Sequence, residues 1–302
     1  MPLHYLRIFS YIEKVAEVGS IRKAAEGLSI TASALDRRVQ DVERELGADL
    51  FERHARGMRL TTAGELFLHH ARSRRADFDR VRTEIEQLKG LRRGKVSVAA
   101  SQALAFSVLP EAMRHFRKAN PGVSFTVRIC DHAAVVEALR NFDAELGLVY
   151  NAQPTADLTT LMEIEQRLCA VMALDHPLAK AESLRMRDCA KYPLALPDGT
   201  LGGRAILEGF FARSSLERNV VLESNSVEML RNFVRSNDAI TFQIQVGTPL
   251  IRPKDGVIGR HIDDRGLARG PLTVAQLRGR HLPLPALRFL ETLRQALGAD
   301  GA

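Results

Sequence analysis

Residues 20–46, SIRKAAEGLSITASALDRRVQDVEREL, decide how the N-terminal part of the chain folds. Ser20 is a favourable N-cap for a short helix over residues 21–28, in which apolar side chains recur at helical spacing. The next three residues predict a tight turn, after which Thr31 or Ala32 opens a second amphipathic helix. Two short helices joined by such a turn predict a helix-turn-helix.

A small hairpin and then a long helix are predicted next. Gly57 stands among extended, arginine-rich residues, which is typical of a basic wing. Residues 62–90 read as one helix that opens with a capping box at Thr62. Its apolar residues follow steps of four and three from Phe67 to Leu88, a heptad seam that needs a partner. We expect that partner to be the same helix of a second chain, and packing on the helix's own domain is the alternative.

From residue 91 onward the period changes, and strand-like runs alternate with helix-like runs. Repeated βα units predict mostly parallel sheets covered by helices. The length of this part suggests two α/β lobes. Ligands of open α/β sheets bind at the carboxyl ends of the strands, near helix N-termini.

Positive charge is concentrated in one segment of this chain of 302 residues, whose formal net charge is +7. Residues 53–95 hold 12 basic and 5 acidic residues. This excess indicates a polyanionic partner, of which nucleic acid is the usual one, although a solvated helix surface explains it equally well. No apolar run approaches the roughly 18 residues that a membrane span needs. The N-terminus lacks the pattern of a secretory signal, so we expect a cytoplasmic protein.

Motifs of catalysis and metal binding are missing from the sequence. The nine histidines form no His-Glu-x-x-His, and neither Gly-x-Ser-x-Gly nor a phosphate-binding glycine loop occurs. The three cysteines are far apart, and we interpret them as small buried hydrophobic residues. We therefore predict no catalytic residues, no metal site and no cofactor.

Four blocks in order, residues 20–28, 31–43, 45–53 and 60–64, together with the segment His176-Pro177-Leu178-Ala179, resemble the LysR-type transcriptional regulators. The resemblance implies a winged helix-turn-helix DNA-binding domain (residues 1–60), a linker helix that forms a dimer (61–90), and an effector-binding domain of two α/β subdomains similar to periplasmic binding proteins (91–302). It also implies assembly into a homodimer and a tetramer, binding to promoter DNA, and control of transcription by a small molecule in the cleft.

A recognition helix reads base edges with the side chains near its N-terminus, and wing residues contact the DNA backbone or minor groove. The candidate DNA-binding residues are Ala32, Ser33, Asp36, Arg37, Arg38, Gln40, Arg53, Arg56 and Arg59. Asp36 departs from the family, which usually has Ser or Thr there. Because a carboxylate repels phosphate, we expect Asp36 to cap, to pair with Arg22 or Arg37, or to accept from a cytosine amino group. For each charged residue, a solvated helix face is the alternative.

Polar residues at strand ends and helix starts are the candidates for effector binding: Ser101, Gln102, Tyr150, Asn151, Thr200, Asn225, Ser226, Thr241 and Gln243. Hydroxyl and amide donors beside helix N-termini suit a small organic anion. Ordinary capping and turn roles are the alternative for each one. Arg128 or Arg204 can supply a counter-charge. We expect Asn237 to take the left-handed turn conformation for which the family often uses glycine.

Three other functions are weighed against a ligand-controlled regulator. A solute-binding protein fits the second half of the chain, but the N-terminal helix-turn-helix argues against it. An enzyme is disfavoured by the missing motifs. A constitutive architectural DNA-binding protein without an effector would respond to no small molecule.

Overall fold

The computed structural model describes residues 4–54, 57–88, 93–106, 108–151, 155–250 and 255–298. The chain divides into two compact units, Met1–Ile85 and Glu86–Ala302, which are taken in turn below. Among the predicted DNA-binding residues, Arg56 lies outside the described residues.

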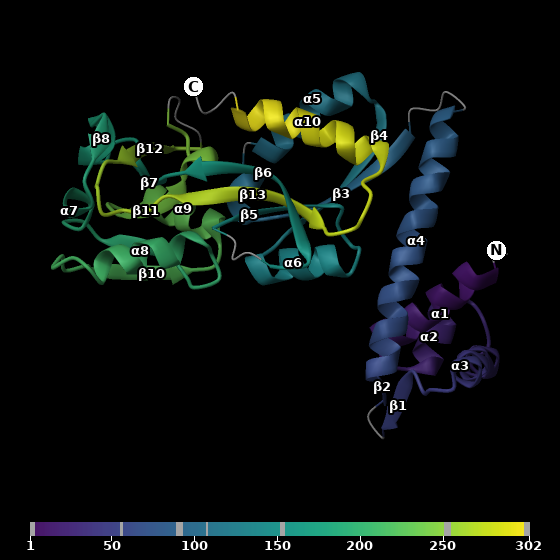
Figure 1. Ribbon diagram of the computed structural model, residues 1–302. Helices are drawn as coiled ribbons and strands as arrows, with labels where there is room; N and C mark the ends of the chain where they lie inside the picture. The colour runs from purple at the N-terminus through teal and green to yellow at the C-terminus, as the bar shows by residue number, and fades with distance from the viewer. Residues whose placement is uncertain are drawn as a thin grey trace. The chain divides into compact units, whose positions relative to one another are not determined.

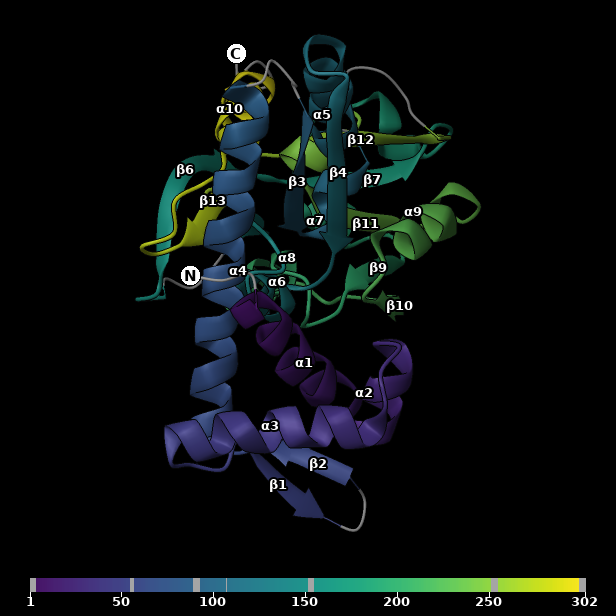
Figure 2. The ribbon, with the colours of Figure 1, turned by 90° about the vertical axis from the view of Figure 1, so that its right-hand side faces the viewer.

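The first unit is a helix-turn-helix followed by a hairpin and a long helix (Figures 1 and 2). Its elements are α1 (His4–Val18), α2 (Ile21–Gly27), α3 (Ala32–Leu46), β1 (Phe51–His54), β2 (Gly57–Leu60) and α4 (Thr62–Leu88). Ser20 and Thr31 cap α2 and α3, since each side-chain oxygen accepts from a backbone N–H three residues on. The cap of α4 differs from the prediction. Thr61, not Thr62, accepts from the N–H of Gly64 at 3.0 Å.

One face of α3 forms the centre of this unit's core. Leu35, Val39 and Val42 are buried at helical spacing and pack against apolar side chains of α1, α2 and β1. The carboxylate of Glu43 accepts from the backbone N–H groups of Leu50 and Phe51, which fixes the chain as it enters the hairpin. The opposite face of α3 is therefore left exposed.

The long helix α4 is buried on its own unit only at its start. Ala71 is buried, Phe67 packs edge-on against Phe9, and Arg72 pairs with Glu13 of α1. Further along, the side chains of Phe78, Val81 and Ile85 are 41%, 41% and 47% exposed. The predicted seam is thus split, because its first residues pack on the helix's own domain and its later ones do not.

The second unit contains two mixed sheets, each with its own helices (Figure 1). Lobe I is the sheet with strand order β4-β3-β5-β13-β6 and its helices. Its strands are β3 (Arg93–Ala100), β4 (Gly122–Ile129), β5 (Leu146–Tyr150), β6 (Leu158–Gln166) and β13 (Gly270–Leu277). Helices α5 (Val108–Ala119) and α10 (Leu284–Gly298) cover one face, and α6 (His132–Arg140) covers the other. The short 3-10 helix η1 (Gln102–Ala105) follows β3.

Lobe II is the sheet with strand order β10-β9-β11-β7-β12-β8 and its helices. Its strands are β7 (Leu168–Ala173), β8 (Ser183–Leu184), β9 (Leu194–Pro197), β10 (Val220–Ser224), β11 (Ile240–Ile244) and β12 (Val257–Ile262). Its helical segments are η2 (Pro177–Lys180), α7 (Met186–Cys189), α8 (Gly203–Phe211), α9 (Val227–Arg235) and η3 (Gln245–Gly247). The apolar side of α9 packs on one face of this sheet and that of α8 on the other.

The chain crosses between the lobes twice, from β6 to β7 and from β12 to β13. Because of these crossings, β13 pairs antiparallel with β5 and β6, and β7 pairs antiparallel with β11 and β12. The prediction of mostly parallel sheets is therefore too simple, since parallel pairs such as β3–β4, β9–β10 and β8–β12 stand beside the antiparallel pairs of β7 and β13. The prediction for Asn237 is also wrong. Its backbone is not left-handed, and its side-chain amide instead donates to the carbonyl of Phe233 at the end of α9.

Candidate functional site

The exposed face of α3 brings together four of the predicted DNA-binding residues. Successive residues of a helix are about 100° apart. Ser33, Asp36, Arg37 and Gln40 therefore lie on the side away from Leu35. Ala32 and Arg38, also exposed, flank this face on either side.

Asp36 connects α3 to the wing rather than standing free. One oxygen of its carboxylate accepts from Arg53 Nη2 at 2.7 Å, and the other accepts from Gln40 Nε2 at 3.0 Å. The predicted pairing with Arg22 or Arg37 is wrong. Arg22 pairs with Glu26 on its own helix at 3.5 Å, and Arg37, as the next residue along α3, points about 100° away. The sequence could not show this contact, because it depends on how β1 lies along α3.

Several cations of this unit are available to phosphate. Within the described residues, Arg37, Arg38 and Arg59 have no ion-pair partner, and all three are exposed. Arg59 lies across the hairpin from Glu52 in the pairing of β1 with β2. Exposed cations without a carboxylate partner need no rearrangement to contact a DNA backbone.

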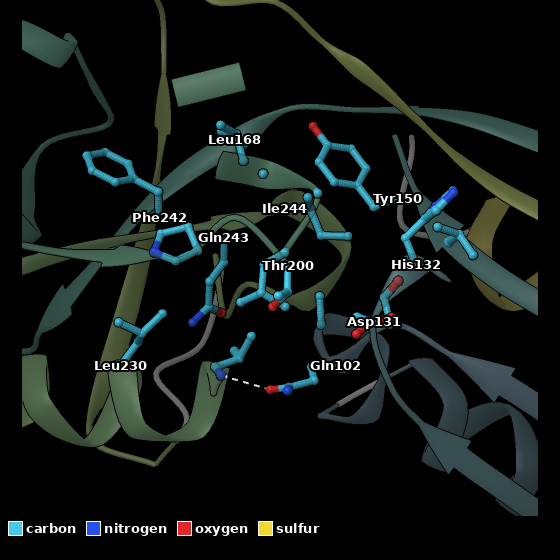
Figure 3. Close-up of a pocket in the computed structure, with 18 of the residues that line it drawn as sticks. Gln102, Asp131, His132, Tyr150, Leu168, Thr200, Leu230, Phe242, Gln243 and Ile244 are labelled. Carbon is cyan, nitrogen blue, oxygen red and sulfur yellow. Dashed lines mark hydrogen bonds between the residues drawn. The ribbon is translucent and has the colours of Figure 1, made fainter. Parts of the chain in front are cut away.

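A cavity lies between lobes I and II, with walls from both (Figure 3). It measures about 50 Å³, enough for a few water molecules or a chemical group of similar size. The residues around it are Ser101, Gln102, Ala103, Cys130, Asp131, His132, Val149, Tyr150, Leu168, Pro197, Thr200, Leu201, Gly202, Gly203, Val227, Leu230, Phe242, Gln243 and Ile244.

Five of the nine predicted effector-binding residues line this cavity: Ser101, Gln102, Tyr150, Thr200 and Gln243. The other four lie outside its lining. Asn151 forms a left-handed turn, Ser226 caps α9, and the backbone carbonyl of Asn225 accepts from Gln102. Thr241 is fully buried on β11.

The two arginines considered as counter-charges are both paired elsewhere. Arg128 pairs with Asp143 in lobe I, and Arg204 pairs with Glu208 and Glu223 in lobe II. Neither lines the cavity. A counter-charge for an anion therefore has to come from another residue.

Gln102 bridges the two lobes across the cavity. Its Nε2 donates to the carbonyl of Asn225 at 2.7 Å, and its Oε1 accepts from the N–H of Val227 at 2.9 Å (Figure 3). One amide thus caps the start of α9 from the opposite lobe. This contact joins lobe I to the start of α9 in lobe II.

Two glycines bring the backbones of the lobes together on either side of this bridge. A Cβ at Gly202 would lie 2.5 Å from the carbonyl oxygen of Tyr150, and one at Gly247 would lie 2.6 Å from that of Ala103. Real Cβ atoms do not approach backbone oxygens so closely. A side chain at either position would hold the lobes apart.

Two buried polar atoms on the cavity residues have no hydrogen-bond partner within the described part of the chain: Tyr150 Oη and Gln243 Nε2. A buried polar group without a partner costs about 1–3 kcal/mol. Burial also raises the pKa of Tyr150, so its hydroxyl stays protonated and can donate.

Sequence reasoning missed Cys130, Asp131 and His132, which follow β4 and line the cavity. Asp131 caps α6, its carboxylate accepting from the N–H of Ala134 at 2.8 Å. The rule that selected Ser101 and Tyr150, polar residues just after a strand, applies equally here and would have found them. Cys130 is partly exposed rather than buried, unlike Cys169 and Cys189.

Among the described residues, no group of three or more His, Cys, Asp or Glu side chains is arranged to hold a metal ion. None of the helices in that part of the chain is long and apolar enough to cross a membrane.

Comparisons with known proteins agree with this architecture. Residues 6–65 match the family described as "Bacterial regulatory helix-turn-helix protein, lysR family", and residues 89–298 match "LysR substrate binding domain". A probable RuBisCO transcriptional regulator of Trichormus variabilis is 28% identical over 271 residues, covering 85% of this chain and 79% of that protein.

Solved structures show the same fold. A full-length OxyR variant from Pseudomonas aeruginosa superposes with a TM-score of 0.69 at 19% identity, covering 97% of this chain and 94% of that one. Full-length CbnR in complex with its target DNA superposes with a TM-score of 0.67 at 19% identity, covering 96% and 99%. With both family matches covering consecutive parts of the sequence, the chain belongs to the LysR family of transcriptional regulators, with a helix-turn-helix DNA-binding part followed by a substrate-binding domain.

Proposed function

We propose that α3 reads promoter DNA in the major groove and that the β1–β2 wing contacts the DNA backbone or minor groove. Ser33, Arg37 and Gln40 present donors and acceptors on one face, and Arg37 suits guanine or phosphate. Arg38, Arg53 and Arg59 supply phosphate contacts. Arg56, which lies between Arg53 and Arg59 in the sequence, is proposed to do the same. Asp36 holds Gln40 and Arg53 in place through its two side-chain contacts. Ala32 contacts a thymine methyl.

The later part of α4 is the proposed dimer interface, with residues 1–60 and 61–90 as the DNA-binding and linker segments. The exposed side chains of Phe78, Val81 and Ile85 follow steps of three and four along one side of the helix. Contiguous apolar surface of this kind is what a second helix covers. Two chains joined in this way need a roughly palindromic site with half-sites one helical turn, or a multiple of it, apart. Pairs of dimers then assemble into tetramers.

Residues 91–302 act as the effector-binding domain, and a small organic anion bound in the cavity between its lobes controls the DNA-binding part. The observation that carries this proposal is the cavity itself, walled by both lobes and closed by the Gln102 bridge. A ligand that binds the closed and open lobes with different affinity shifts their populations. The protein performs no catalysis, needs no cofactor, and works in the cytoplasm, where promoter DNA is found.

Binding of the purified full chain to the intergenic DNA upstream of its own gene tests the proposal. Fluorescence anisotropy is measured with excess random competitor at two salt concentrations. Binding that survives competitor supports specific recognition. Binding that is equally weak on all sequences and falls equally with salt contradicts it.

The effector role is tested on the same complex with a panel of small organic acids. A change in DNA affinity or in the length of protected DNA supports ligand control. Specific DNA binding that responds to no ligand would instead make the protein a constitutive DNA-binding protein, and this part of the proposal would be wrong.

A further inference from the structure

A network of three side chains joins the exposed face of α3 to the wing. The two oxygens of the Asp36 carboxylate have different partners. Oδ1 accepts from Arg53 Nη2 of β1 at 2.7 Å, and Oδ2 accepts from Gln40 Nε2 at 3.0 Å. Asp36 and Gln40 are four residues apart, so they lie on the same side of α3. Asp36 therefore connects Gln40, an exposed residue, to the hairpin.

This network determines which end of the Gln40 amide is committed. A carboxylate only accepts hydrogen bonds, so the nitrogen end of the amide must face it. One of the two N–H bonds of Nε2 is used in this way. Within the described residues, no partner is found for Gln40 Oε1. The amide is therefore left with its oxygen as an acceptor and with one N–H as a donor for contacts outside the protein.

Among the four bases, adenine matches the groups that remain on this amide. In the major groove adenine presents its N6 amino group beside the acceptor N7, and a glutamine amide can contact both at once. Guanine presents only the acceptors N7 and O6 there, and thymine presents the acceptor O4 and a methyl group. Both leave the amide oxygen without a donor. Cytosine presents an amino group but no neighbouring acceptor for the N–H.

We propose that Asp36 orients Gln40 to read adenine, so that Gln40 contacts the base and Asp36 is a positioning residue. Gln40 Oε1 accepts from the N6 amino group, and the remaining N–H of Nε2 donates to N7. The inference rests on the proposed reading of DNA by α3 and names one base that this helix selects. Through Arg53, the same carboxylate ties the orientation of the amide to the place of the wing.

Selection from random-sequence duplexes by the purified full chain, followed by sequencing, gives the preferred site of the wild type. Gln40→Met keeps the length of the side chain and removes the amide, so it should lose the preference at one base pair of each half-site. We expect that pair to be A·T. In anisotropy titrations of duplexes that differ only there, the wild type should bind A·T about fivefold or more tightly than G·C.

A purine base that lacks the 6-amino group tests the contact of Gln40 Oε1 directly. Placed instead of the adenine at this pair, it should lower the affinity of the wild type more than that of Gln40→Met. Both proteins meet the same duplex, so any weakening of the base pair itself affects them equally. The difference between the two losses isolates the hydrogen bond from the amino group to Gln40.

Asp36→Asn tests the positioning role, because it exchanges one oxygen for an NH2 group of the same size. Arg53 only donates, so it keeps the remaining oxygen, and the NH2 group faces Gln40. The Gln40 amide should then turn its oxygen inward and present Nε2 to the DNA. We expect this variant to bind G·C at least as tightly as A·T at the same pair. Asp41→Asn, about 140° round α3, removes the same charge and should keep the adenine preference.

Three results overturn the inference. One is a Gln40→Met variant that loses no preference, or loses it at a G·C pair. Another is an Asp36→Asn variant that still prefers A·T; a purely structural role for Asp36 would change all affinities and leave the preferred base as it is. The third is a preference that Asp36→Asn abolishes and Gln40→Met keeps, since Asp36 would then contact the base itself. Failure of the proposed function is a separate outcome, in which the wild type selects no sequence at all.

Discussion

The bridge made by Gln102 allows the closed arrangement of the lobes to be tested quantitatively. Its amide forms two hydrogen bonds across the cavity, at 2.7 Å to Asn225 and 2.9 Å to Val227. Each such bond contributes about 1 kcal/mol net, so Gln102→Ala removes about 2 kcal/mol from the closed arrangement. Since about 1.4 kcal/mol is a factor of ten, the population of open lobes should rise about 30-fold.

Hydrogen–deuterium exchange reports this opening at Val227, whose backbone N–H is the donor to Gln102. In Gln102→Ala, we expect a peptide covering the start of α9 to exchange about 30-fold faster at this amide, as the energy above requires. The matched control is Gln276→Ala, which removes a hydrogen bond of 3.1 Å to the carbonyl of Arg280 within lobe I.

The two variants together decide the result. Faster exchange at Val227 in Gln102→Ala alone supports the bridge. Unchanged exchange in Gln102→Ala would refute the reasoning that this amide holds the lobes together. Equal acceleration in both variants would mean a general loss of stability and would also contradict it.

Three further predictions concern the DNA face, the dimer and the pH dependence of stability. Arg37→Ala should weaken binding to the specific site by about 1–3 kcal/mol while barely affecting random DNA; equal losses in anisotropy titrations would make Arg37 a phosphate contact. Phe78→Glu places a charge on the exposed apolar side of α4 and should shift sedimentation equilibrium toward monomer, whereas Thr83→Glu, about 140° round the helix, should not. Burial lowers the pKa of His176, so the unfolded chain binds this proton more readily, and stability should be complete above about pH 6.5 and fall as the pH drops below it. As the pH is lowered, the urea midpoint of His176→Asn, whose side chain can still accept from Leu178 N–H, should fall less steeply than that of the wild-type protein. An equal pH dependence of the midpoint in the two proteins would contradict this role of His176.

Local elements were predictable because neighbouring residues decide them. Ser20 caps α2 as expected, and α3 begins at Ala32, one of the two starts that the sequence allowed. Capping oxygens reach only two or three residues along the chain, so the information lies within a short window. The same reasoning misplaced the cap of α4 by one residue, since Thr61 and Thr62 are chemically identical candidates.

The candidate cavity was only partly predictable. Polar residues after strands were the right kind of residue, and Ser101, Tyr150 and Gln243 do line it. Thr241, on the same strand as Gln243, is fully buried and does not line the cavity, and the pattern of polar residues along the strand could not separate the two. Asp131 was overlooked although it satisfies the same rule.

By itself, the sequence determined the helix-turn-helix, the long helix after it and the alternation of strands and helices, because period and caps act over a few residues. The tertiary structure alone decided that β7 and β13 pair antiparallel and that Asp36 meets Arg53. Each of these depends on which surfaces meet when the chain crosses between lobes or when the hairpin closes on α3. Such contacts are selected by the packing of whole elements, and no local pattern encodes their partners.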